Sequence, residues 1–266
     1  MQIGHAVAVL NREEKMKEYI TGQLKTHVYE TRDEMGAAAA TDIAVEMKRL
    51  LAVKDEINMI FAAAPSQNDV LASLRVDKSI PWEKVNAFHM DEYIGLTEEA
   101  PQSFARFLKD AIFDCLPFKS VNLIRGGEDP ESECARYTKL LNEYPTDIVV
   151  MGIGENGHIA FNDPPVADFN DPETIKPVKL DEVCRMQQVH DGCFPDIDSV
   201  PQYALSLTVP ALMKAGARFC IVPCTTKAEA VRKTLNGPIG EVCPATALRV
   251  TANSTMYCDR DSAALL

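Results

Sequence analysis

Short apolar runs alternate along this chain with longer segments in which apolar residues recur at helical spacing. The apolar runs predict strands at residues 57–64, 85–90, 121–124, 147–151, 218–223 and 255–258. The longer segments predict helices at residues 31–51, 102–115, 129–142 and 227–235. Strands that alternate with helices are typical of parallel sheets, because each crossover returns the chain to the same edge. We therefore expect an α/β fold with a doubly wound, mostly parallel sheet and helices on both faces, a Rossmann-like three-layer arrangement.

The length of 266 residues suits one large domain. Residues 11–24 are largely polar and indicate an amphipathic helix outside the main body. We expect an N-terminal helical extension at residues 1–25 and a single α/β catalytic domain at residues 26–266. Residues 164–200 hold several Pro and Asp residues, which predict an irregular lid or a long active-site loop.

Composition excludes several classes of protein. The formal net charge of −12 argues against a nucleic-acid binder, because such proteins depend on clustered Lys and Arg. Apolar runs are all shorter than the roughly 18 residues of a membrane span, and the N-terminus does not resemble a signal peptide. The eight cysteines include no CxxC pair, so we expect reduced thiols and no structural zinc. These features predict a cytoplasmic protein.

Ligands of such sheets bind beyond the carboxyl ends of the strands, and a glycine-rich turn follows the strand at 147–151. Gly152-x-Gly154-x-x-Gly157 matches the dinucleotide fingerprint formally, but the double proline after it prevents the helix that the fingerprint requires. Backbone amides such as that of Gly157 are nevertheless open to a ligand. His158 ends the turn and is a candidate acid–base group, the alternative being a structural histidine.

Two adjacent acids, Asp91 and Glu92, follow the strand at 85–90. In an extended segment their side chains point to opposite sides, so at most one of them faces a ligand. An acid at this edge is a candidate general base, although a helix cap or a solvated turn is the alternative. His89 is expected to be a strand residue packed against the next helix.

Lys227 follows the strand at 218–223 and begins a helix. A basic group beside a helix N-terminus suits a phosphate, although a lysine in this position can also be merely solvated.

Taken together, these loops resemble the glucosamine-6-phosphate deaminase (isomerase) family. The matching segments lie in the family's order between residues 31 and 259 and read NAFHMDEYIGL (86–96), GIGENGHIAFNDP (152–164), SVPQYALSLTVPAL (199–212) and CIVPCTTKAEAVRKTLNG (220–237). The related 6-phosphogluconolactonases share the fold and a Gly-His turn but lack the Phe-Asn-acid-Pro ending. The resemblance is therefore to the deaminases.

The resemblance implies an aldose–ketose isomerase that converts an amino-sugar phosphate to a ketose phosphate and ammonia, without a cofactor or metal. It implies that Asp91 accepts the C2 proton and that His158 takes part in opening the sugar ring. Asn156 stands where many members carry Asp, and Asp163 stands where the family has Glu as the partner of the histidine. This chemistry requires Asp91 and His158 to share one cavity.

The phosphate site departs from the family's pattern. The loop after the first strand, rich in Gly and Thr in the family, here offers Ser66 and the amides of Gln67 and Asn68. The family's phosphate-binding Arg is missing, and Arg185 is the candidate substitute. Two alternatives therefore stay open: the same fold acting on another sugar or sugar phosphate, including a lactonase, and a non-catalytic sugar-phosphate-binding protein.

The chain ends like the shorter members of the family, so a non-allosteric monomer or homodimer is expected. Asp at position 163 has a shorter side chain than Glu, so a longer or water-mediated contact with His158 is expected.

Overall fold

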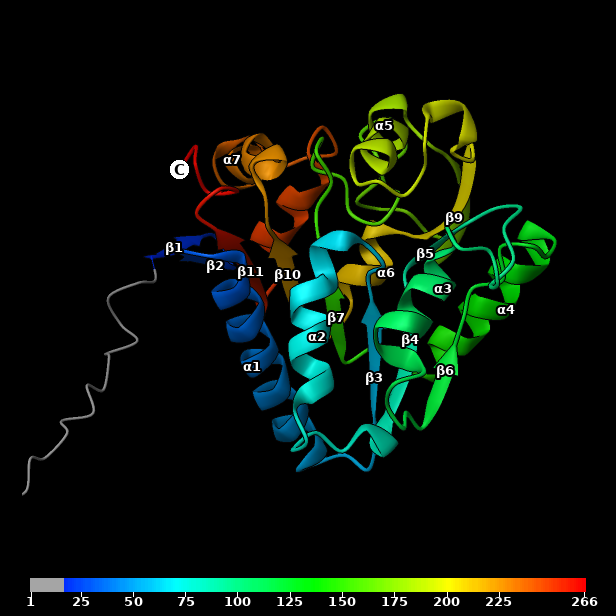
Figure 1. The fold of residues 1–266 in the computed structure, drawn as a ribbon, viewed down its shortest axis with the longest axis horizontal. Helices are drawn as coiled ribbons and strands as arrows, with labels where there is room; N and C mark the ends of the chain where they lie inside the picture. Colours follow the sequence, from blue (N-terminus) through cyan, green and yellow to red (C-terminus); the bar gives the residue numbers. More distant parts are fainter. Residues whose placement is uncertain (1–16) are drawn as a thin grey trace, which may run out of the picture.

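The computed structural model describes residues 17–266, and an eight-stranded sheet forms its centre (Figure 1). The strand order is β1-β2-β11-β10-β7-β3-β4-β6. Every neighbouring pair is parallel except the antiparallel hairpin of β1 and β2, so the predicted mostly parallel sheet is confirmed. The strands are β1 (Lys17–Thr21), β2 (Leu24–Tyr29), β3 (Ile57–Phe61), β4 (Val85–His89), β6 (Ser120–Asn122), β7 (Ile148–Met151), β10 (Ala217–Val222) and β11 (Ser254–Asp259).

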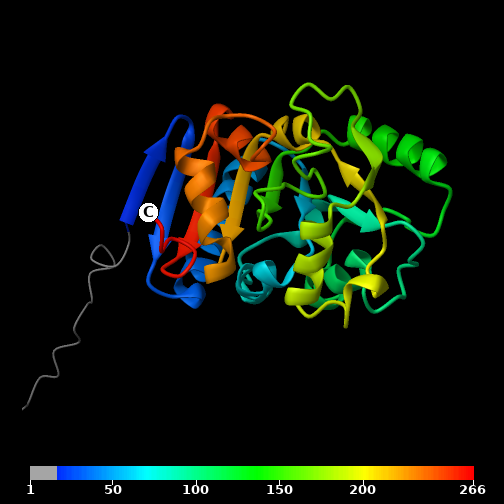
Figure 2. The same cartoon turned by 90° about the horizontal axis from the view of Figure 1, so that it is seen from above.

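Helices cover both faces of this sheet, as Figures 1 and 2 show, and the three-layer prediction is confirmed. Along β3, Met59 and Phe61 pack into the core cluster on one face, and Ile60 packs into the cluster on the other. The first face carries α1 (Arg32–Leu51), α2 (Asn68–Val76) and α3 (Phe104–Leu108); the second cluster takes buried residues from α4 (Pro130–Glu143), α6 (Val209–Met213) and α7 (Ala228–Asn236). None of the helices in residues 17–266 is long and apolar enough to cross a membrane.

Helix α1 begins at a fixed point near the carboxyl ends of the strands. The hydroxyl of Thr31 accepts a hydrogen bond from the amide of Glu34, and the Glu34 carboxylate accepts one from the amide of Thr31. This capping box satisfies two of the free amides at a helix start. A side chain at Gly36 would meet Asp69 of α2 within 2.6 Å, so the glycine lets the two helices approach closely. The first residue of α1, Arg32, is thereby held beside the start of α2.

A second, three-stranded antiparallel sheet in the order β5-β9-β8 was not predicted. Its strands are β5 (Asp91–Tyr93), β8 (Ile175–Lys179) and β9 (Tyr203–Leu207). One residue, Met90, separates β4 from β5, so the chain passes directly from the large sheet into the small one. Residues 164–200, expected to be irregular and to form a lid or a long active-site loop, instead contain β8 and the helix α5 (Glu182–His190). Two buried residues of β8, Ile175 and Val178, pack into the core and hold this segment against it.

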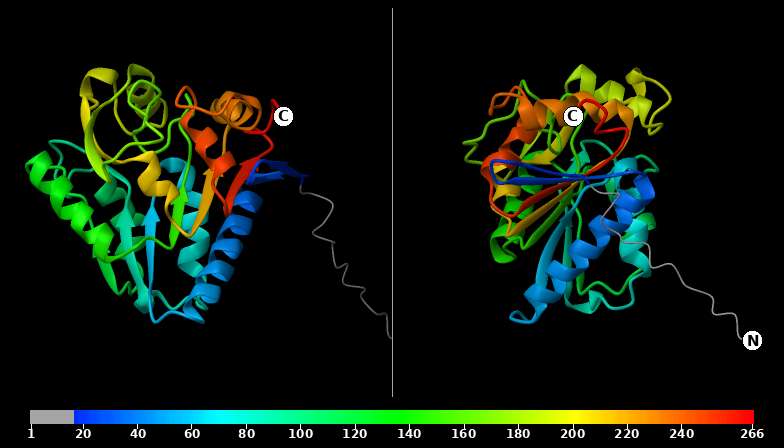
Figure 3. Two further views of the ribbon diagram at one scale, coloured as in Figure 1. Left: turned by 180° about the vertical axis from the view of Figure 1, so that it is seen from behind. Right: turned by 90° about the vertical axis from the view of Figure 1, so that its left-hand side faces the viewer.

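The predicted helix at residues 11–24 is wrong where the structure describes it. Residues 17–21 form β1, Gly22 makes a turn with a φ of 62°, and β2 begins at Leu24. The hairpin lies at one edge of the large sheet, as the left-hand view of Figure 3 shows. Because β2 pairs with β11, the domain boundary expected at residue 25 falls inside a strand of this sheet. Alternate residues of β2 are buried, which is the period of a strand. Residues 1–16 lie outside the described part.

Candidate active site

One cavity lies beyond the carboxyl ends of the parallel strands, with a volume of about 760 Å³ that is partly open to solvent. Its walls come from the segments that follow β3, β4, β7 and β10. Both Asp91 and His158 line this cavity. The prediction that the carboxylate and the imidazole share one cavity is therefore confirmed.

Asp91 is the first residue of β5 and is 7 % exposed. Burial, and secondarily the neighbouring Glu92, raise the pKa of Asp91 well above its ordinary value. Glu92 turns away from the cavity, as the alternation of a strand requires, and accepts hydrogen bonds from the amides of Phe104 and Ala105 at the start of α3. Burial raises the pKa of Glu92 to about 7. A carboxylate with a raised pKa is a stronger base once ionised, which suits Asp91 to proton abstraction.

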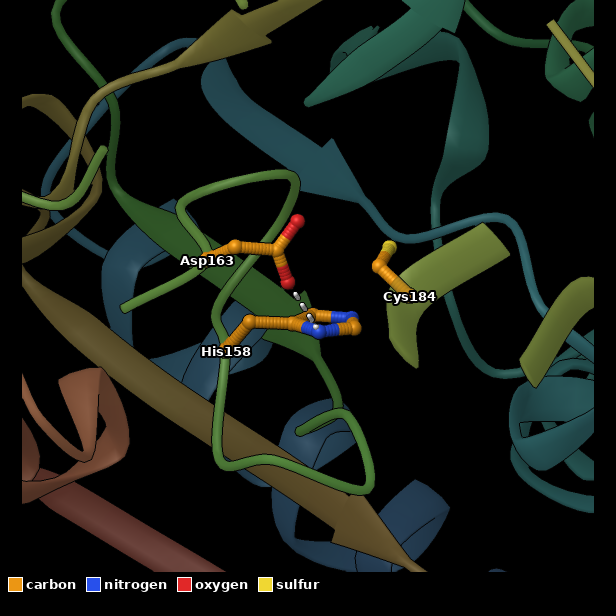
Figure 4. Close-up of side chains that lie close together, drawn as sticks. All are labelled: His158, Asp163 and Cys184. Atoms are coloured by element: carbon orange, nitrogen blue, oxygen red, sulfur yellow. Dashed lines mark ion pairs between the residues drawn. The ribbon is translucent and has the colours of Figure 1, made fainter. Parts of the chain in front are cut away.

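His158 is oriented by two partners on the same loop, one of which, Asp163, is drawn beside it in Figure 4. Its Nδ1 lies 2.8 Å from Oδ1 of Asn156 and 3.0 Å from Oδ1 of Asp163. Asn156 in turn donates from Nδ2 to Asp163 Oδ1 at 2.9 Å. Because both neighbours of Nδ1 are acceptors, Nδ1 carries a proton and Nε2 is left for a ligand. The contact between Asp163 and His158 is direct, in contrast to the longer contact expected from the shorter side chain.

The glycines of the turn make room for this imidazole. A Cβ at Gly154 would lie 2.0–2.3 Å from three ring atoms of His158, so any other residue there would displace the ring. The amide of Gly154 donates to the carbonyl of His158 at 2.9 Å and closes the turn. The Gly-rich motif thus serves the position of the histidine rather than a nucleotide.

The charge of Asp163 is stabilised by its neighbours. Burial opposes its ionisation, but the hydrogen bond and charge of His158, with help from Asn156, bring the pKa of Asp163 below its ordinary value.

Cys184 of α5 lies beside the pair (Figure 4), and one donor atom from each of the three residues lies within 4.8 Å of the others. Burial raises the pKa of the Cys184 thiol well above its ordinary value, and the nearby carboxylate of Asp163 adds to this. A soft metal ion could be held by this set only by displacing the thiol proton and the His158–Asp163 contact.

The other end of the cavity carries groups suited to an anion. Ser66 and Gln67 form the turn between β3 and α2, and the Ser66 hydroxyl accepts a hydrogen bond from Nε2 of Gln67 at 3.0 Å. Lys227 is 5 % exposed, and its Nζ has no hydrogen-bond partner in the described part of the chain. Burial lowers the pKa of Lys227 from its ordinary value. A buried ammonium without a partner is costly, so its presence at a cavity wall points to a ligand.

Arg32 also lines this end and was missed in the sequence. Its Nε pairs with Asp69, its Nη2 donates to the carbonyl of Pro65, and its Nη1 donates to Sγ of Cys224 at 3.4 Å. A guanidinium has five N–H donors, so two remain for a ligand. Position 32 matches no motif, and only its place as the first residue of a helix that starts at the carboxyl edge indicates its role.

A family model described as glucosamine-6-phosphate isomerases/6-phosphogluconolactonase matches residues 30–257. The chain belongs to this family. The glucosamine-6-phosphate deaminases of Bacillus thuringiensis (strain Al Hakam) and Bacillus anthracis (strain A0248) are 34% identical to it over 220 residues, which is 82% of this chain and 82% of each relative. The family is one of enzymes, both isomerases or deaminases and lactonases.

Solved structures of the family share the fold. A monomeric glucosamine-6-phosphate deaminase superposes with a TM-score of 0.82 and 29% identity, covering 91% of this chain and 99% of the other. The 6-phosphogluconolactonase of Thermotoga maritima superposes with a TM-score of 0.71 and 19% identity, covering 88% and 99%, and this likeness concerns the fold alone.

Three residues proposed for the family's ligand site lie away from the cavity walls. Asn68 is exposed at the start of α2. Gly157 is buried against Cys243 with a φ of 83°, so it shapes the turn. Arg185 lines a different cavity, behind Asp163, where its Nη2 donates to the carbonyls of Ile197 and Val200. The structure therefore does not bring Arg185 to the place of the family's missing arginine.

His89 is a core residue, as expected. It is fully buried in β4, its Nε2 accepts a hydrogen bond from the amide of Ile124 at 2.7 Å, and its ring lies against Tyr137 of α4. Burial lowers the pKa of His89 to about 3. The imidazole is therefore neutral and structural.

Proposed function

We propose that this protein is a deaminase of an amino-sugar phosphate of the glucosamine 6-phosphate type, releasing a ketose phosphate and ammonia. The single observation that carries the proposal is one cavity that contains the Asp91 carboxylate, the oriented His158 imidazole and, around Lys227, an end suited to an anion, here called the anion end. The curated relatives named as glucosamine-6-phosphate deaminases support the same activity.

The residues suit the steps of this reaction. His158, with Nδ1 committed to Asn156 and Asp163, presents Nε2 to exchange a proton with the ring oxygen, which opens the pyranose. Asp91 removes the proton from C2 of the open chain and returns it to C1. As the C2 proton leaves, its electron pair forms a C1=C2 double bond and the C1 oxygen takes up a proton from solvent. As C1 is protonated, the nitrogen lone pair forms a C2=N bond, and water hydrolyses this imine to the ketone and ammonia.

The anion end favours a phosphorylated sugar over a free one. Within residues 17–266, Lys227 supplies a buried positive charge without a protein partner, and Arg32 retains two N–H donors that are not bonded to the protein. The side chain of Ser66 lies at the same end, whereas the amide of Gln67 already donates to the carbonyl of Ala64 at 2.9 Å. Hydrogen bonds that involve an ionised partner are about twice as strong as neutral ones, so a phosphate gains more here than a hydroxyl does.

The test is ammonia release measured from glucosamine 6-phosphate, its galacto epimer and unphosphorylated glucosamine. We expect turnover of a phosphorylated amino sugar, and a kcat lowered about 10²–10⁴-fold by Asp91→Asn with little change in KM. Asp114→Asn, which alters an exposed carboxylate, serves as the matched control and should retain full activity. No ammonia from either phosphorylated epimer at high enzyme concentration would reject the deaminase.

The lactonases of the family supply the second candidate, because the matching family model includes them. Lactone hydrolysis involves no proton removal from C2, so a lactonase would keep its activity in the Asp91→Asn variant. Hydrolysis of 6-phosphogluconolactone by both proteins separates the two reactions.

A further inference from the structure

Cys224 occupies a backbone conformation that favours glycine. It follows β10 with a φ of 81° and a ψ of 147°. This region is almost restricted to glycine, and another residue costs about 1–3 kcal/mol there. The conformation is held by the carboxylate of Asp259, which accepts hydrogen bonds from the amide of Cys224 at 3.1 and 3.2 Å. A side chain is thus fixed at a place where the fold would be more relaxed without one.

The thiol lies at the anion end of the cavity. Cys224 is half-buried and lines the cavity together with Arg32 and Lys227. Its Sγ accepts a hydrogen bond from Nη1 of Arg32 at 3.4 Å. The Nζ of Lys227, which has no hydrogen-bond partner among residues 17–266, is an independent sign that a negatively charged group enters here. Any anion drawn to that ammonium comes close to the sulfur.

We propose that Cys224 is a covalent modification site for anionic disulfides, and that its modification competes with phosphate for the same end of the cavity. The local charges are mixed. Arg32 is paired with Asp69, and the carboxylate of Asp259 lies against the amide of Cys224. Asp91 and Asp191 line the cavity as well, so the attraction of an anion rests chiefly on Lys227. A cation in a cleft raises the local concentration of anionic reagents.

The reaction is thiol–disulfide exchange. The sulfur of Cys224 attacks one sulfur of the disulfide, the reagent's S–S bond breaks, and a new mixed S–S bond forms. The departing thiolate takes the proton from Cys224. The sulfur of Cys224 is oxidised and the released half of the reagent is reduced, so no further oxidant is needed.

Most other cysteines are poorly placed to react. Cys184, Cys220, Cys243 and Cys258 are buried. Burial raises the pKa of both Cys134 and Cys193 to about 11, which disfavours their thiolates. Cys115 is exposed and lies away from the cavity, and Nη1 of Arg75 donates to its Sγ at 3.7 Å. It is therefore a built-in comparison: an accessible thiol beside an arginine, but without the buried ammonium of Lys227.

The test compares two disulfides on the intact protein, the dianionic dithiobis(nitrobenzoate) and the dicationic cystamine, with peptide mass spectrometry to locate each modification. We expect Cys224 to react at least about tenfold faster with the anionic reagent, relative to the ratio at Cys115. Inorganic phosphate should slow modification at Cys224 and leave Cys115 unaffected. Lys227→Met should abolish the charge preference at Cys224.

An unmodified Cys224, equal charge preference at Cys224 and Cys115, or no slowing by saturating phosphate would each overturn the proposal. Cys224→Ser, which keeps the side-chain size, identifies the modified peptide by its absence. The labelling requires no turnover, so an enzyme inactive on amino-sugar phosphates would still be modified at Cys224, and the two proposals fail separately.

Discussion

Replacing Lys227 with methionine should make the protein more stable while weakening its binding of the sugar phosphate. Methionine has a similar length and no charge, so it fills the space of the lysine stem and leaves no buried donor. Lys227 is 5 % exposed and its Nζ is unpartnered among the described residues. The substitution therefore removes a cost that the free protein bears and a ligand-bound protein does not.

The magnitude follows from the burial of the ammonium. A buried donor left unsatisfied costs about 1–3 kcal/mol, and a charged donor costs more. We expect the free energy of unfolding to rise by about 1–3 kcal/mol at neutral pH. For a domain of this size, each kcal/mol raises Tm by about 2–4 °C.

The gain should depend on pH. Burial holds the pKa of Lys227 below the ordinary value of 10.5, so between the two pKa values the unfolded chain binds more protons than the folded one. The stability of the wild-type protein therefore rises with pH through this window, whereas the variant has no such contribution. The advantage of Lys227→Met should shrink as the pH approaches 10.5.

Calorimetry with and without inorganic phosphate, together with KM for the sugar phosphate, is the assay. Phosphate should raise the Tm of the wild-type protein and leave that of Lys227→Met unchanged. Lys176→Met is the matched control: Nζ of Lys176 donates to the carboxylate of Asp171 at 2.5 Å and to the carbonyl of Val166, so its loss should destabilise the protein. A variant at 227 that melts below the wild type, or keeps its KM, would refute the reasoning.

Three further predictions concern other residues of the cavity. Arg32→Ala should raise KM about 10–100-fold through lost charge-assisted hydrogen bonds, whereas Arg185→Ala should change KM less than about twofold; steady-state kinetics decide. The free energy of unfolding of Cys224→Gly should exceed that of Cys224→Ala by about 1–3 kcal/mol, because only glycine adopts the positive φ without strain. Equal thermal stability of the two variants would exclude strain at this position. Burial raises the pKa of Asp163, but the hydrogen bond and charge of His158 outweigh this, and the pKa is lowered. The Asp163 carboxylate therefore stabilises the fold above its ordinary pKa, and this stabilisation is lost as the pH falls through the lowered value. Asp163→Asn should be less stable than the wild type at neutral pH and approach it in acid, as measured by acid unfolding followed by circular dichroism.

The large sheet could be predicted because its central strands are buried on both faces. β7 is a continuous apolar run, β3 is apolar except for Asn58, and every residue of both strands is buried. Such runs are visible in the sequence. Asp91 and His158 could be found for the same reason, since each follows a recognisable strand. A three-residue strand such as β5 leaves no period to detect, and the small sheet was therefore missed.

The N-terminal hairpin shows a different limit. β1 is an edge strand with exposed and half-buried residues on both sides, and charged residues at an edge protect a sheet from pairing with other chains. The same polarity is typical of a surface helix, so composition alone misled the assignment. Arg32 escaped detection for another reason: its role depends on where α1 starts relative to β3, which is a tertiary property.

The single residue between β4 and β5 has a consequence for how this enzyme can diversify. Asp91 lies where the chain passes from the large sheet into the small one, so backbone hydrogen bonds of β4 and of β5 fix the position of its carboxylate. The wall that α5 contributes through Gln187 and Gln188 lies outside both sheets, and Oε1 of Gln187 accepts a hydrogen bond from the amide of Glu155. Substitutions in α5 can therefore change which ligand fits the cavity while the Asp91 carboxylate keeps its position. A change of substrate then needs no change in the reaction.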